Sequence, residues 1–139
     1  MKKFLNSTDD FLKESLQGLG AAHEDIISCH YDPNFITRSK ATKKGKVAII
    51  SGGGSGHEPM HGGVVGYGML DAACPGFVFS SPSPDQMIAA SEKVEGGAGI
   101  LFIVKNYSGD IMNFQMASEM VTRVTVSYTH LRAHETAVN

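Results

Sequence analysis

An apolar run that passes directly into a cluster of glycines constrains this chain more than any other feature. Residues 46–61 read KVAIISGGGSGHEPMH, so four apolar residues lead into a segment of four glycines and two serines that ends at a histidine. A continuous apolar run of this kind is typical of a strand buried on both faces of a parallel sheet. A glycine-rich turn after such a strand lets backbone N–H groups converge on a small polar ligand. We therefore expect a small-molecule site where this strand ends.

The rest of the chain alternates between helical and extended patterns. Helices are expected over residues 8–20, 84–95 and 110–123, and strands over residues 46–51, 77–80 and 100–104, with a short extended piece at 35–37. Residues 59–69 could form a short helix, although four glycines make it a poor one. Strands that alternate with helices indicate right-handed crossovers. The predicted fold class is α/β, an open, mainly parallel sheet with flanking helices.

Polar loops follow two of the expected strands. The glycine-rich segment comes after Ile50, and KNYSGD, residues 105–110, comes after Val104. Ligands of α/β sheets bind outside the carboxyl ends of the strands, so neighbouring strands would bring both loops to one crevice. Lys105 and Asp110 are the candidate polar side chains of the second loop. The alternative is a solvated pair at a helix start, with Asp110 as an N-cap.

The histidines at the end of the glycine-rich segment resemble a metal motif. His57 to His61 spell H-E-x-x-H, in which a zinc protease places both histidines on one face of a regular helix. Pro59 stands between them and glycines precede them, so we expect no metal site and a local hydrogen-bonding role for His61. A zinc hydrolase is kept as a third hypothesis. The glycines match neither a P-loop, which needs a lysine here, nor a full G-x-G-x-x-G fingerprint.

Composition excludes several classes of function. A net charge of −2 gives no electrostatic reason to expect nucleic acid or anionic membrane as a partner. Cys29 and Cys74 form no C-x-x-C pair, so neither a zinc ribbon nor a disulfide framework is indicated. No apolar stretch has the length of a membrane span, and the start turns polar at Asn6 instead of forming a signal peptide. We expect a cytoplasmic protein.

The last residues have an unusual composition. Val126 to Thr136 read VSYTHLRAHET, which resembles one translated frame of a common transposase-type sequencing adapter. We therefore expect residues 125–139 to be a non-native tail that takes no part in the predicted fold. Residues 1–124 are expected to be the native part of the chain. His130 and His134, which resemble a metal pair, fall in the tail and are discounted.

Several segments together resemble a known family, the substrate-binding subunits of dihydroxyacetone kinases. They are SGGGSGHEPMH at 51–61, ACPG at 73–76, SSPSPDQ at 80–86 and IVKNYSGDIMNF at 103–114, and HYDPNFITR at 30–38 also fits. The motifs occur in the family's order at comparable spacing, from residue 1 to about residue 120. This corresponds to the first third of a full-length family member, so the resemblance implies that residues 1–124 are the N-terminal part of a dihydroxyacetone-binding domain.

The resemblance implies a reaction, phosphorylation of the three-carbon ketose dihydroxyacetone, and a role for each matching residue. Backbone groups of residues 54–57 would bind the ketose oxygens, and His57 would orient and polarise the substrate. Lys105 and Asp110 would hydrogen-bond its hydroxyls, with Asp110 taking the proton of the hydroxyl that is phosphorylated. The implied substrate-binding residues are Gly54, Ser55, Gly56, His57, Lys105 and Asp110, of which His57 and Asp110 would be catalytic.

The family also holds the ketose through a covalent bond to a histidine in a later part of the chain. None of the six histidines present matches it, so we expect the 139-residue chain not to catalyse the reaction alone. The donor would be a separate subunit carrying ADP, fed from phosphoenolpyruvate by a phosphotransferase system, or ATP-Mg in a fused branch. The sequence favours the first, with no cofactor bound by this chain.

The resemblance further implies a homodimer for the full-length protein. It also leaves a second class of function open, because some proteins of this type sense the same ketose and assist a transcription regulator without phosphorylating it. Intact Lys105 and Asp110 favour the kinase.

Overall fold

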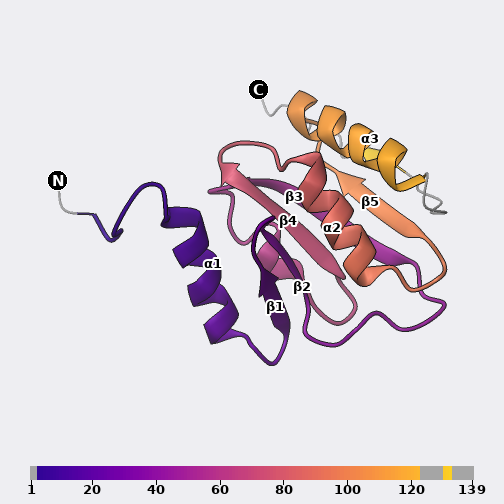
Figure 1. Ribbon diagram of the computed structural model, residues 1–139, viewed down its shortest axis with the longest axis horizontal. Coiled ribbons are helices and arrows are strands. Elements are labelled where there is room, and N and C mark those ends of the chain that lie inside the picture. Colours follow the sequence, from indigo (N-terminus) through magenta and orange to yellow (C-terminus); the bar gives the residue numbers. More distant parts are fainter. Residues whose placement is uncertain (1–2, 123–129, 133–139) are drawn as a thin grey trace, which may run out of the picture.

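The computed structural model describes residues 3–122 and 130–132 as helices packed against a sheet (Figure 1). The elements in chain order are α1 (Phe11–Ala22), β1 (Ile27–His30), β2 (Phe35–Arg38), β3 (Ala48–Ser55), the 3₁₀ helix η1 (Gly62–Val64), β4 (Ala72–Val78), α2 (Pro84–Val94), β5 (Ile100–Val104), α3 (Ser108–Thr122) and β6 (His130–Arg132).

The strands form a single sheet in the order β1-β2-β4-β3-β5-β6. The central strand β3 pairs in parallel with β4 on one side and β5 on the other, and β5 pairs in parallel with β6. The β1–β2 and β2–β4 pairs are antiparallel. The expected open, mainly parallel sheet with flanking helices is thus confirmed.

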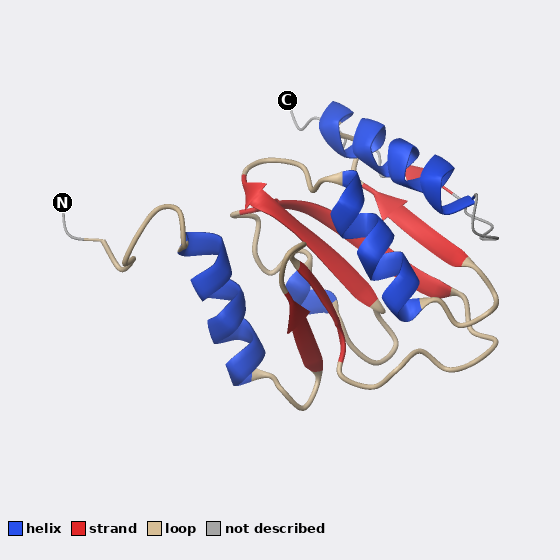
Figure 2. Ribbon diagram, viewed as in Figure 1, coloured by secondary structure: helices blue, strands red, loops and turns tan. Residues whose placement is uncertain are grey.

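Each face of the sheet has its own apolar core. Helices α2 and α3 lie across one face (Figure 2), where buried side chains such as Ile50, Phe102 and Phe114 form the larger cluster. The second cluster joins α1 to β2, with Leu16 packed near Ile36. Successive residues of a strand point to opposite faces, so Ile50 joins the first cluster while Ile49 packs against the second.

The strand that was expected to end at residue 51 continues through the glycines to Ser55, so the glycine-rich turn was misplaced. Gly52 and Gly54 pair in register with Cys74 and Gly76 of β4. Glycine is needed here for close approach, because a Cβ on Gly52 would lie 2.6 Å from the Cys74 carbonyl oxygen. The chain turns only at Gly56, whose φ is +105°.

Two further expectations were wrong, and one strand was not predicted. The strand expected at 77–80 is β4, which begins at Ala72 because Pro75 and Gly76 lie inside it instead of ending it. Residues 59–69 form turns and η1, not an α-helix. Strand β1 was missed, and β2 extends the short piece expected at 35–37.

The other expected elements are present, with shifted ends. Strand β5 has the expected bounds, and α2 begins at Pro84 after a capping box between Ser83 and Gln86. Helix α1 begins at Phe11 and α3 at Ser108, within three residues of the expected starts. None of the helices in the described part of the chain is long and apolar enough to cross a membrane.

The predicted non-native tail falls largely outside the described residues, which include only the backbone of β6 from it. The boundary between 1–124 and 125–139 therefore stays a prediction.

Candidate functional site

Side chains from three segments meet over one glycine at the carboxyl end of β3. Lys105 follows β5, Asp110 lies in the first turn of α3, and His61 precedes η1. The Lys105 Nζ is 4.0 Å from the Asp110 Oδ2. A Cβ on Gly53 would lie 2.5 Å from the Lys105 Nζ and 2.8 Å from the His61 Cε1. Gly53 therefore lies directly beneath the cluster, and any side chain at this position would displace Lys105 and His61.

This cluster has unfilled hydrogen-bonding capacity. Among the described residues, the Asp110 Oδ1 and the His61 Nδ1 are buried without a hydrogen-bond partner. The 4.0 Å separation of Lys105 and Asp110 is an ion pair but too long for a hydrogen bond. Buried polar atoms in native proteins nearly always have a partner, protein or water. A small molecule with several oxygens would supply those partners to all three side chains.

His61 is held in its neutral form by its surroundings. Burial lowers its pKa most, the positive charge of Lys105 lowers it further, and Asp110 opposes these effects, which leaves a pKa of about 4. The imidazole is therefore neutral at pH 7. From the sequence, only a local hydrogen-bonding role was expected for His61. No pattern in the sequence indicated that the turns after β3 bring His61 back over Gly53.

The predicted site residues 54–57 follow Gly53 in the chain. Three of them, Gly54, Gly56 and His57, lie close to Phe79. A Cβ on Gly54 would lie 2.7 Å from the Ser80 amide nitrogen, and one on Gly56 would meet the Phe79 ring. The His57 ring is edge-on to Phe79, with centroids 5.3 Å apart. His57 itself is exposed.

Ser55 has a structural side chain. Its buried hydroxyl donates to the Gly76 carbonyl oxygen at 2.7 Å and so ties β3 to β4. Of the six predicted site residues, Lys105 and Asp110 lie in the cluster over Gly53, while 54–57 form the segment beside it. The individual binding roles stay predictions.

The H-E-x-x-H segment lacks the helix that a zinc protease needs. Residues 57–61 form turns, so His57 and His61 do not share a helical face. Within residues 3–122 and 130–132, no group of three or more His, Cys, Asp or Glu side chains could hold a metal ion. The structure of the described residues therefore does not support the zinc hydrolase hypothesis.

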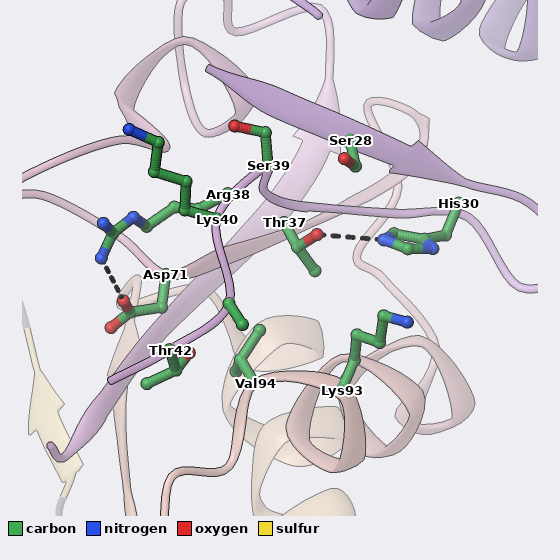
Figure 3. Close-up of a pocket in the computed structure, with 11 residues that line it drawn as sticks. Ser28, His30, Thr37, Arg38, Ser39, Lys40, Thr42, Asp71, Lys93 and Val94 are labelled. Atoms are coloured by element: carbon green, nitrogen blue, oxygen red, sulfur yellow. Dashed lines mark hydrogen bonds and ion pairs between the residues drawn. The ribbon is translucent and has the colours of Figure 1, made fainter. Parts of the chain in front are cut away.

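A separate pocket of about 370 Å³ opens at the opposite edge of the sheet, around Asp71 (Figure 3). The buried Asp71 carboxylate accepts from Arg38 at 3.2 Å, from the Ile49 amide at 2.8 Å and from Lys46. Burial alone would raise the pKa of Asp71, but these donors outweigh it and lower the pKa below its usual value. The close pairing indicates that Asp71 stabilises the fold.

His30 and Thr37 line the same pocket, and Figure 3 shows the His30 ring directed toward the Thr37 hydroxyl. The two side chains are 3.0 Å apart, and His30 also stacks on Phe35 with centroids 4.3 Å apart. Burial and the nearby Lys93 lower the pKa of His30.

The polar, largely buried cluster lies at the carboxyl edge of a mainly parallel sheet, which is where α/β domains commonly bind small molecules. The family can be stated more closely. This chain belongs to the Dak1 domain family, whose sequence profile matches residues 17–135.

Curated relatives and solved structures agree with this assignment. The chain is 52% identical over 121 residues to the dihydroxyacetone-binding subunit DhaK of the PEP-dependent dihydroxyacetone kinase of Escherichia coli K12, covering 87% of this chain and 34% of the relative. It is 51% identical over 119 residues to the PTS-dependent DhaK of Lactococcus lactis, covering 86% of this chain and 36% of that one. The chain thus spans about a third of these relatives.

The crystal structure of the Citrobacter freundii dihydroxyacetone kinase with AMP-PNP and Mg²⁺ superposes with a TM-score of 0.87 at 40% identity, over 95% of this chain and 25% of that one. The dihydroxyacetone kinase operon co-activator Dha-DhaQ superposes with a TM-score of 0.82 at 32% identity, over 88% of this chain and 37% of that one.

Proposed function

We propose that this chain binds dihydroxyacetone and presents one hydroxyl for phosphorylation, as part of the substrate-binding subunit of a dihydroxyacetone kinase. The observation that carries this proposal is the cluster of Lys105, Asp110 and His61 over Gly53, with its unfilled hydrogen-bonding capacity. A three-carbon ketose offers two hydroxyls and a carbonyl to such a cluster. The names of the relatives support the same substrate.

The chemistry suits these residues. A carboxylate that accepts the hydroxyl proton makes that oxygen a better nucleophile toward a phosphoryl group, and Asp110 is the only carboxylate that the described structure places against Lys105. The Lys105 ammonium would hydrogen-bond a ketose oxygen and stabilise negative charge on it. His57, beside the cluster and exposed, would meet the substrate from the open side.

We further propose the phosphoenolpyruvate-dependent type, with phosphoryl transfer from a nucleotide-carrying partner subunit, in a cytoplasmic homodimer. In support, the relatives at 52% and 51% identity are named PEP- or PTS-dependent. The C. freundii kinase, which was crystallised with the ATP analogue AMP-PNP and Mg²⁺, is less similar, at 42% identity over the aligned sequence. In this arrangement the ADP belongs to the partner subunit and this chain binds no cofactor of its own.

A second candidate function is sensing. The co-activator Dha-DhaQ shares the fold at 32% identity, so a ketose-binding chain of this shape can also serve a transcription regulator. The pair of Lys105 and Asp110 favours the kinase, because sensing needs no proton acceptor at the hydroxyl.

Binding of dihydroxyacetone should depend on both charged residues. In the 139-residue chain, we expect Lys105→Met and Asp110→Asn each to weaken binding about tenfold or more, since a hydrogen bond to a charged group contributes about 1.5–3 kcal/mol. An NMR titration of amide resonances with the ketose measures this. Lys13→Met, on the exposed surface of α1, is the matched control and should bind like the unsubstituted chain. Unchanged affinity in both site variants would contradict the proposal.

We also propose that residues 125–139 are non-native, on the support of the adapter-like reading of Val126 to Thr136. The Dak1 profile extends to residue 135, so the two observations differ over this segment. Independent long-read sequencing of the source DNA beyond the Val124 codon is expected to show a different downstream reading frame. Recovery of a frame that encodes SYTHLRAHETAVN would show that the tail is native.

A further inference from the structure

His61 occupies a position that neither the motifs nor the resemblance assigns to the substrate. A Cβ on Gly53 would lie 2.8 Å from the His61 Cε1 and 2.5 Å from the Lys105 Nζ, so the two side chains cover the same glycine. In an imidazole the Cε1 lies between the two ring nitrogens, so His61 presents its polar edge toward the cluster. One of those nitrogens, Nδ1, is buried and has no hydrogen-bond partner within the described chain. The ring therefore has capacity for a bond that the protein itself does not fill.

The neighbours of His61 explain why the ring stays neutral. Three titratable groups act on it, Lys105 and His57, which disfavour the protonated form, and Asp110, which favours it. The ring also lines a cavity of about 430 Å³, together with Gly53 and with apolar residues of α1 and β2, among them Leu16 and Ile36. The largest effect on the His61 pKa is burial, which removes water from around the imidazole and so disfavours its charged form.

A neutral imidazole adds a capability that the two charged residues lack. An ammonium only donates hydrogen bonds and a carboxylate only accepts them, whereas a neutral imidazole donates at one nitrogen and accepts at the other. A hydroxyl of a ketose is both donor and acceptor. A cluster of all three groups can therefore hold two hydroxyls and a carbonyl without leaving a buried polar atom unpaired.

We propose that His61 is a substrate-binding residue, which hydrogen-bonds a ketose hydroxyl through its buried ring nitrogen alongside Lys105 and Asp110. This inference rests on the proposed function and adds a specificity-determining residue to it. Ketoses that lack the hydroxyl would leave the Nδ1 unpaired, and so they would bind less tightly.

The first test observes the ring itself. In the ¹⁵N-labelled 139-residue chain at pH 7, saturating dihydroxyacetone is expected to shift the ring-nitrogen resonances of His61, while those of the exposed His23 stay unchanged. A purely structural histidine would keep its ring resonances. Unmoved His61 nitrogens, together with shifted amides at 54–57 and at Lys105, would overturn this inference and leave the proposed function standing. An absence of shifts throughout the chain would overturn both.

The second test separates shape from hydrogen bonding. His61→Phe keeps a ring but removes both nitrogens, and we expect it to weaken dihydroxyacetone binding about tenfold. His61→Asn places an amide near the Nδ1 position and is expected to bind within about threefold of the unsubstituted chain. His23→Phe is the control at an exposed position. Equal affinity of His61→Phe and the unsubstituted chain would overturn the inference, and the ring resonances decide it if that variant does not fold.

Discussion

Replacing both cations that face Asp71 is expected to lower the free energy of unfolding at pH 7 by about 3 kcal/mol or more. In the Arg38→Met, Lys46→Met double variant, the Asp71 carboxylate would remain fully buried and would keep only the Ile49 amide of its three present donors. Breaking a buried ion pair by removing one side costs about 3–5 kcal/mol, because the remaining charge is uncompensated. Urea unfolding followed by circular dichroism measures the loss.

The dependence on pH and a third substitution identify the cause. In the unsubstituted chain the folded pKa of Asp71 is lowered, so its stabilising contribution is present above the unfolded value of 3.8 and is lost as pH falls through the folded pKa. In the double variant the buried, unpaired carboxylate has the opposite shift, so the stability difference should shrink toward pH 4. Adding Asp71→Asn should restore part of the stability at pH 7. A loss independent of pH and unrelieved by Asp71→Asn would show that packing, not charge, is responsible.

A side chain at Gly76 should destabilise the domain nearly as much as the loss of both cations that face Asp71. Gly76 is buried in β4, and a Cβ there would lie 2.0 Å from the Ser80 carbonyl oxygen and 2.8 Å from the Pro82 nitrogen. Both contacts are with backbone, so no rotamer change relieves them. We expect Gly76→Ala to lower the free energy of unfolding by about 3 kcal/mol, the upper part of the range for overpacked sites.

A glycine in open space provides the control for Gly76. Gly18 lies in α1, and nothing lies within 4 Å of the position that a Cβ would take there. Gly18→Ala should therefore raise the free energy of unfolding by about 0.5–1 kcal/mol through helix propensity. Thermal or urea unfolding of the two variants side by side measures the contrast. Similar stabilities of Gly76→Ala and the unsubstituted chain would mean that the turn after β4 moves easily, contrary to the structure.

The sequence predicted the parts of the fold that depend on uninterrupted patterns. Strand β5 is a run of five apolar residues, and α2 follows a Ser–Pro start with a glutamine at the capping position, so both were located closely. Strand β4 was misjudged, because a buried strand that contains Pro75 and Gly76 reads locally as a turn. In this case tertiary pairing with β3 overrides local propensity.

In the candidate site, too, some residues could be predicted from the sequence and others could not. Lys105 and Asp110 follow a recognisable strand, so their place at the carboxyl edge of the sheet could be predicted from the strand alone. His61 and Gly53 could not, because His61 reaches the site only through turns whose path no periodic pattern records. Gly53 was taken for part of a turn, and its contact with Lys105 exists only once β3 and β5 are neighbours.

The three glycines of β3 are each confined by a different neighbour. A methyl group at Gly52 would meet Cys74, one at Gly53 would meet Lys105 and His61, and one at Gly54 would meet Phe79 and Ser80. A compensating change at one of these neighbours would make room at one glycine and leave the other two as confined as before. A lineage that exchanges this tripeptide for larger residues must therefore make three separate compensating changes, one in the strand pair, one in the cluster over Gly53 and one in the turn after β4.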